Sequence, residues 1–119
     1  QIAHKRMLLE QRYSSAGALT DSTSWGWQDL GALWVPLEYE VFGAIVWGTP
    51  GWSEGQAVQY PIFANTYLSR IKGAGNGWWL ASVRSGNSTG ACVVHNYGNA
   101  DYWDASSSLR VPVCFRITA

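Results

Sequence analysis

Apolar and other side chains alternate without interruption along the closing segment, residues 109–117. Because successive side chains of a strand point to opposite faces, this alternation predicts a β-strand with one apolar face. We expect that face to point inward, and it consists of Leu109, Val111, Val113, Phe115 and Ile117. Pro112 has no backbone N–H to donate, so it places this strand at a sheet edge or at a bulge.

Two further strands are predicted just before this segment. The run Trp78–Val83 is aromatic and β-branched and follows a glycine-rich turn at residues 73–77, which favours a central strand. Residues 91–97 also predict a strand, and the polar segment 85–90 predicts a hairpin turn between the two. The C-terminal half is therefore expected to form a small, twisted antiparallel sheet.

Helices are expected only in the N-terminal half. Residues 2–12 mix apolar with charged side chains and contain few residues that resist helix formation, so they predict a short amphipathic helix. A second helix is predicted to begin near Pro36, with apolar residues at helical spacing as far as Ile45 and a stop at Gly48. These helices and the sheet predict a loop-rich α+β fold with two short helices.

Aromatic residues are expected to anchor the loops. The polar segment 20–31 contains Trp25 and Trp27, so we interpret it as an ordered loop held by its tryptophans. Residues 56–72 show no clear pattern, and Pro61 prevents a continuous helix there. The predicted core contains Trp34, Phe42, Ile45, Trp78, Leu80, Val111, Val113 and Phe115.

Length and charge limit what the chain can be. At 119 residues it fits a single domain, 1–119, which at this size buries about two-thirds of the surface of the unfolded chain. The formal net charge is +0, so no excess positive field attracts nucleic acid. The sequence contains no apolar run of about 18 residues, so membrane insertion is not expected. The chain begins with Gln1, and we expect it to be the C-terminal part of a longer polypeptide.

The sequence offers little for catalysis or metal binding. His4 and His95 accompany no recognisable nucleophile motif, so we predict no catalytic residues and no enzyme activity. Four oxygen-bearing side chains between residues 96 and 104 match no calcium loop, so polar display is favoured over a metal site and no cofactor is expected. Cys92 and Cys114 are interpreted as free thiols, with a cross-strand disulfide as the alternative.

The polar segment 84–108 has the composition of a binding surface. It interleaves Arg, Asn, Ser, His, Tyr, Asp and Trp with small residues. Antibody-type surfaces favour such residues, because Tyr and Trp give contact area at low entropy cost while Ser, Asn and Gly adapt their hydrogen bonds. Solvated hairpin loops have the same composition, so on this ground alone both interpretations stay open.

Three stretches, in this order, resemble a bacterial and phage C-type-lectin-like domain family. They are LWVPLEYEVFG at 33–43, GWWLASV at 77–83 and LRVPVCFRI at 109–117. The family repeats a W-L-P-S-E-x-E-x-x-G helix start, a W-W-L-R-S strand and a terminal V-R-P-x-x-x-I strand. Leu37 and Ala81 depart from this pattern, as does the order of residues 110–112.

The resemblance implies a C-type-lectin-like fold shared with relatives of the formylglycine-generating enzymes. The paired active-site cysteines of those enzymes are missing, as is the Glu-Pro-Asn or Gln-Pro-Asp triplet of calcium-dependent sugar-binding lectins. Family members usually serve as ligand-display modules of phage structural proteins or bacterial surface adhesins. The resemblance therefore implies a virion or bacterial cell-surface location and a host cell-surface protein or glycan as partner.

Some relatives are variable proteins of diversity-generating retroelements. In these, codon changes between the double-Trp strand and the final strand alter the side chains that bind the receptor. Transferred to this sequence, the resemblance implies a binding face within residues 84–108. Its candidate residues are Arg84, Ser85, Asn87, His95, Asn96, Tyr97, Asn99, Asp101, Tyr102 and, as a fixed anchor at the edge, Trp103.

A structural role is the alternative to ligand binding. A virion decoration or oligomerisation domain would pack exposed aromatic side chains against copies of the chain, so that a homo-oligomer forms through the parent protein. In that case the interface residues would be Trp25, Trp27, Trp47 and Trp52.

Overall fold

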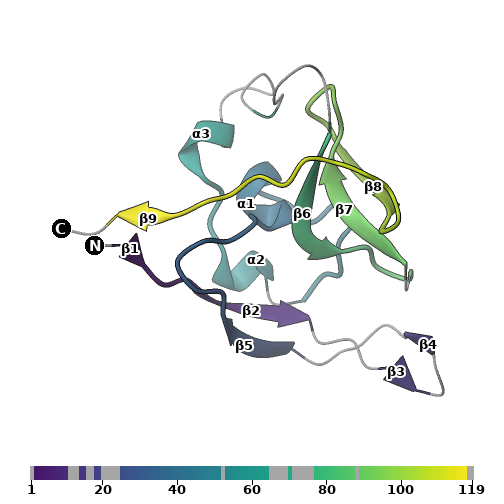
Figure 1. Cartoon of the computed structure of the whole chain (residues 1–119), viewed down its shortest axis with the longest axis horizontal. Coiled ribbons are helices and arrows are strands. Elements are labelled where there is room, and N and C mark those ends of the chain that lie inside the picture. The colour runs from purple at the N-terminus through teal and green to yellow at the C-terminus, as the bar shows by residue number, and fades with distance from the viewer. Residues whose placement is uncertain are drawn as a thin grey trace.

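A three-stranded antiparallel sheet forms the centre of the C-terminal half (Figure 1). The computed structural model describes residues 2–10, 14–15, 18–19, 25–51, 53–64, 70, 77–87 and 89–117. Within them β6 (Trp78–Val83), β7 (Gly90–Val94) and β8 (Ala100–Asp104) are neighbours in this order. β6 and β7 were predicted, and β7 ends three residues before the predicted boundary because the chain turns at Gly98, whose φ of 88° favours glycine.

The predicted helix over residues 2–12 is wrong. Residues 11 and 12 lie outside the described part, but the rest forms β1 (Ile2–Ala3) and β2 (Arg6–Glu10). β2 pairs with β5 (Trp25–Asp29), which we had interpreted as a loop. A short helix is only marginally stable by itself, whereas pairing gives every second backbone group a partner and buries Met7.

Short strands complete the N-terminal half. β3 (Ser14–Ser15) pairs with β4 (Ala18–Leu19). β1 pairs antiparallel with β9 (Arg116–Ile117), which brings the two ends of the chain side by side (Figure 1). In the described part of the chain the helices therefore lie between two groups of strands, instead of coming first with the sheet after them.

Three short helices lie between β5 and β6 in the described part of the chain: α1 (Glu38–Phe42), α2 (Ser53–Gln56) and α3 (Pro61–Ala64). The predicted helix after Pro36 is confirmed as α1, but it is shorter than expected. It ends because Gly43 adopts a left-handed φ of 68° and donates its N–H to Tyr39 O at 2.8 Å. Ile45 therefore lies beyond the helix.

The core lies between α1, α3 and the inner face of the sheet. Its buried cluster consists of Val41, Phe63, Trp78, Leu80, Cys92 and Val94. Trp78 fills the centre, with its ring centroid 5.9 Å from that of Phe63 and its indole N–H donated to Arg70 O. Of the predicted core residues, Trp34, Trp78 and Leu80 are buried as expected, while Phe42 and Ile45 are half-buried.

The inward orientation predicted for Val111, Val113, Phe115 and Ile117 is wrong, because all four are exposed. The segment is extended and crosses back over β6 (Figure 1), with Trp79 N donating to Arg110 O at 2.9 Å and Cys114 N donating to Trp34 O at 2.8 Å. Val113 is 59% exposed and Phe115 is 55% exposed. Alternation defines two faces but not which of them meets the core. Here the half-buried Pro112 and Cys114 face the molecule.

Candidate functional site

The predicted ligand-binding residues lie at both ends of the central sheet. Arg84, Ser85 and Asn87 occupy the connection from β6 to β7, whereas His95, Asn96, Tyr97 and Asn99 occupy the connection from β7 to β8. Asp101, Tyr102 and Trp103 lie on β8. Because β7 separates the two turns by a full strand length of roughly 17 Å, these residues do not form one continuous patch.

Five of them share one surface, which we call the hairpin face: His95, Tyr97, Asn99, Asp101 and Trp103. In the β7–β8 register Val93 pairs with Asp101 and Ala91 with Trp103, so these side chains project on the side opposite the core. The His95 ring centroid lies 5.4 Å from that of Tyr97 and 6.4 Å from that of Trp103. Tyr97 is 72% exposed and Trp103 is 39% exposed.

Buried residues and backbone hydrogen bonds hold the hairpin face in place. Cys92 and Val94 point from the same strand into the core, and Val93 is also buried. In the turn, His95 N donates to Asn99 O and Gly98 N donates to His95 O, each at 2.8 Å. Tyr97 N donates to His95 Nδ1 at 3.4 Å. The aromatic side chains therefore project from a rigid backbone.

Arg84 and Tyr102 belong to a second cluster on the core side of the sheet. The Arg84 guanidinium lies 3.4 Å from the centroid of the Tyr102 ring, and the Trp47 ring lies 4.7 Å from it on an edge-to-face geometry. Trp47 also donates its indole N–H to Ala100 O, and its own carbonyl accepts the N–H of Ser85. This cluster fastens the Trp47 loop to the sheet.

The Asn87 side chain closes the turn between β6 and β7 through hydrogen bonds. Its Oδ1 accepts hydrogen bonds from Thr89 N at 2.8 Å, Thr89 Oγ1 at 3.1 Å and Gly90 N at 2.7 Å. Such bonds are typical of Asn at a tight turn. Asn96 is half-buried, and its Oδ1 is buried without a hydrogen-bond partner in the described part of the chain. Neither residue joins the hairpin face.

The oxygen-bearing residues near β8 are not brought together. Asp101 and Asp104 have opposite parity on β8, so they project from opposite faces of the sheet. Ser106 N donates to Asp104 Oδ1, and this bond lowers the pKa of Asp104. Across the described ranges, no group of three or more His, Cys, Asp or Glu side chains could hold a metal ion. No disulfide joins Cys92 to Cys114.

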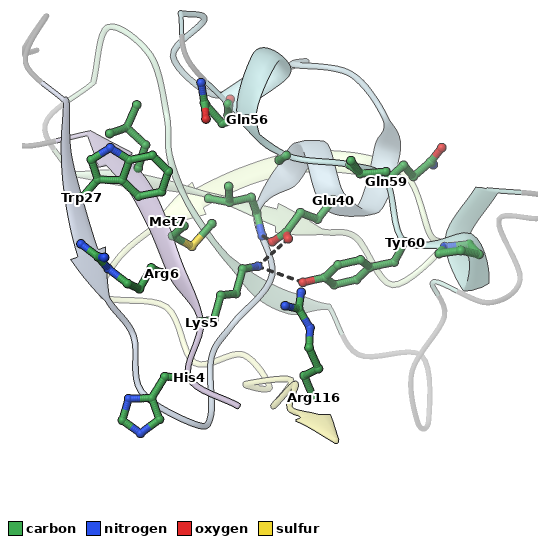
Figure 2. Close-up of a pocket in the computed structure, with 16 residues that line it drawn as sticks. His4, Lys5, Arg6, Met7, Trp27, Glu40, Gln56, Gln59, Tyr60 and Arg116 are labelled. Atoms are coloured by element: carbon green, nitrogen blue, oxygen red, sulfur yellow. Dashed lines mark hydrogen bonds and ion pairs between the residues drawn. The ribbon is translucent and has the colours of Figure 1, made fainter. Parts of the chain in front are cut away.

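A pocket of about 400 Å³ is the feature that sequence reasoning missed. It lies between β2, α1 and the stretch from α2 to α3, and a buried polar group forms its floor (Figure 2). Lys5 Nζ lies 2.5 Å from Glu40 Oε2 and 2.9 Å from Tyr60 Oη, while Trp34 donates its indole N–H to the same Tyr60 oxygen. Burial and the neighbouring Glu40 carboxylate raise the pKa of Tyr60, so its hydroxyl stays protonated.

This pocket was missed because its parts are distant in sequence. Lys5 and Tyr60 are 55 positions apart. The sequence predicts a short amphipathic helix over residues 2–12 and shows no clear pattern over residues 56–72. The local sequence contains no signal for it, because Lys5 lies between His4 and Arg6 and so resembles part of a solvated charged run.

Comparison with protein-family models, with curated proteins and with solved structures gives no match for this chain. In the described residues, no helix has both the length and the apolarity that crossing a membrane requires.

Proposed function

We propose that this domain binds a ligand or receptor through the hairpin face and serves as a display module. The observation that carries the proposal is an aromatic cluster left open to solvent on a hairpin whose other side lies in the core. Its partner would be a host cell-surface protein or glycan, and its place the surface of a virion or a bacterial cell.

The chemistry of the hairpin face fits recognition. Tyr97 and Trp103 are large, rigid side chains that lose little entropy on binding, and residues of these types dominate binding hot spots. Asn99 and Asp101 add hydrogen-bonding groups beside them. His95 packs between the two aromatic rings, a setting that suits contact with a ligand better than proton transfer. The net charge of +0 favours neutral contacts over steering by a charged surface.

The motif resemblance supports the same role. Residues 84–108 lie between the two stretches that resemble the C-type-lectin-like family and correspond to its receptor-binding region. Within that window, the hairpin face can change while the buried strand positions stay constant. A variable protein of a diversity-generating retroelement requires this separation of replaceable surface from fixed core.

Replacing Tyr97 and Trp103 together by alanine is expected to weaken cell binding at least about tenfold, because each is a hot-spot type of residue whose loss costs roughly 1–2 kcal/mol or more. The test is flow cytometry of the fluorescently labelled domain on a panel of intact bacterial strains. The matched control is Leu33→Ala with Val46→Ala, which removes two exposed apolar side chains elsewhere. Equal loss in both variants, or no binding of the wild-type domain to any strain, contradicts the proposal.

Self-association is a second candidate, favoured by the exposed apolar row Val111, Val113, Phe115 and Ile117. Monomers rarely expose a contiguous apolar patch of this kind without using it. The row is symmetric about Cys114, so an antiparallel copy would place Val113 opposite Phe115 and Val111 opposite Ile117. Of the four tryptophans predicted for this role, Trp27 is exposed and lines the pocket beside β2. The others fit less well, because Trp25 is half-buried, Trp47 packs on the sheet and Trp52 lies outside the described residues.

If this row forms an interface, the domain is expected to dimerise, and Val113→Asp with Phe115→Asp is expected to yield a monomer because a desolvated carboxylate opposes pairing. Light scattering over a hundredfold dilution series measures the mass directly. Leu33→Asp, at an exposed residue outside the row, is the control. A wild-type mass that stays monomeric at every concentration rules out this role.

A further inference from the structure

The pocket beside β2 has the size and lining of a small-molecule site. Its volume of about 400 Å³ falls in the range of roughly 300–1,000 Å³ found for ligand pockets. Figure 2 shows Trp27 and Met7 along one side, Tyr60 on the opposite side and Gln56 at the top. The hairpin face contributes no residue to it, so the two surfaces are independent.

The floor of the pocket is fixed before any ligand arrives. Lys5 and Glu40 are both buried, and their ion pair is completed by the Tyr60 hydroxyl. An ammonium group has three N–H donors. Two of those of Lys5 are directed at Glu40 and Tyr60. Lys5 Nζ also lies 5.1 Å from the centroid of the Trp34 ring. It makes no further hydrogen bond within the described residues, so the third donor can serve an acceptor on a bound molecule.

The lining carries more positive than negative charge, although the whole chain is neutral. Lys5, Arg6 and Arg116 line the pocket, and Glu40, already paired with Lys5, is the one carboxylate among its lining residues. Within the described residues neither arginine forms an ion pair, although Arg6 lies opposite Asp29 in the β2–β5 register. The hydrogen bond from Gly31 N and, to a smaller extent, the charge of Arg6 lower the pKa of Asp29. In Figure 2 the Arg116 side chain extends toward Lys5 and Tyr60. A planar guanidinium in that position matches a carboxylate.

The rest of the lining is largely apolar. Met7 and Leu37 are buried at the wall, and the exposed side chains of Trp27 and Val58 stand at the rim. An inorganic anion would leave these surfaces uncovered. A molecule that joins an apolar body to one anionic group would satisfy both parts of the pocket.

We infer that the pocket binds a small organic carboxylate with an aromatic or aliphatic body. The carboxylate lies against Arg116 and the free donor of Lys5, and the body packs between Trp27 and Val58. This site differs from the hairpin face in position and in ligand class.

The test is an NMR titration of the ¹⁵N-labelled domain with benzoate, 3-phenylpropionate and 4-phenylbutyrate. At least one acid is expected to bind with Kd below about 1 mM and to shift the Trp27 indole and Lys5 signals. The corresponding neutral amide and acetate are each expected to bind at least about tenfold more weakly. If none of the three acids shifts these signals below about 10 mM, or if the amide binds equally well, the inference is overturned.

A charge-matched pair of variants locates the site. Arg116→Gln is expected to weaken binding of the tightest acid about tenfold, because it removes a charge-assisted hydrogen bond. Arg110→Gln removes the same charge from an exposed residue of the same segment that does not line the pocket, and it is expected to bind as the wild type does. Equal losses in the two variants would overturn the assignment. Loss of cell binding through Tyr97 and Trp103 leaves this titration unaffected, so the two proposals fail separately.

Discussion

Glu38→Ala is expected to lower the free energy of unfolding by about 4 kcal/mol, because three backbone donors, one buried and two partly buried, lose their partner, and a buried donor without a partner costs roughly 1–3 kcal/mol. Glu38 is 0% exposed. Its carboxylate accepts the backbone N–H groups of Val46, Trp47 and Gly48 at 2.9, 2.9 and 3.0 Å. Since a domain of this size is stable by only about 5–15 kcal/mol, this substitution removes a large share. Urea denaturation measures the loss.

Two variants make this prediction specific. Glu38→Gln keeps the shape and one acceptor oxygen, so it is expected to lose about half as much. Glu54→Ala removes an exposed glutamate that accepts one N–H, from Gly51 at 3.0 Å, and it is expected to cost under about 1 kcal/mol. A Glu38→Ala protein no less stable than Glu54→Ala would show that the loop does not depend on this carboxylate.

Glu38 also connects the helix to the sheet. Its own N–H is donated to Ser82 Oγ on β6 at 2.9 Å. The loop that it holds carries Trp47, which packs against Tyr102 on β8 and accepts the N–H of Ser85. One buried side chain therefore positions α1, the Trp47 loop and the sheet relative to one another. Its removal is expected to loosen the support of β8.

The second large loss of folding stability is expected when the buried ion pair between Lys5 and Glu40 is broken. Lys5→Met leaves the Glu40 carboxylate buried without its cation, which is expected to cost about 3–5 kcal/mol, and Glu40→Leu is expected to cost a similar amount. The double variant is expected to recover most of this loss, because two apolar side chains can fill the space that the pair occupied. It keeps a deficit of about 1 kcal/mol, since Glu40 Oε1 also accepts Leu37 N at 3.0 Å.

A thermodynamic cycle of these variants by urea denaturation measures the coupling between Lys5 and Glu40. Coupling of roughly 2 kcal/mol or more is expected for a buried pair in direct contact. Losses in the double variant equal to the sum of the two single losses would show that the charges do not depend on each other. The control pair is His4 and Asp29, which are exposed and 3.3 Å apart.

Elements with a strong local pattern could be predicted from the sequence. β6 and β7 are rich in aromatic and β-branched residues and flank a polar turn, and α1 follows Pro36 at the expected place. The strand character of residues 6–10 was missed because it depends on pairing with Trp25–Asp29, which no local window contains. Long-range pairing overrides weak helix propensity here.

The orientation of side chains was harder to predict than the elements. The strand predicted over residues 109–117 is confirmed only at Arg116–Ile117, with single bridges at Arg110 and Cys114, and which side of the segment faces inward depends on where Trp34 and β6 lie. The orientation of side chains also separates residues of the candidate site that are close in sequence. Tyr102 and Trp103 are neighbours in sequence, yet one packs with Trp47 on the core side and the other lies on the hairpin face. The residues that line the pocket come from both ends of the chain and from its middle, so no local motif predicts it.

The proposed function requires that a fixed core carries a hairpin face whose side chains can be replaced. The most direct test compares the melting temperature of the double variant Tyr97→Ala with Trp103→Ala with that of Leu80→Ala. Leu80 is buried in the core cluster, and its truncation is expected to cost about 2–5 kcal/mol and to lower the melting temperature by roughly 10 °C or more. The double variant of the hairpin face is expected to melt within about 4 °C of the wild type. A decrease as large as that of Leu80→Ala would mean that Tyr97 and Trp103 hold the fold together, which contradicts the account.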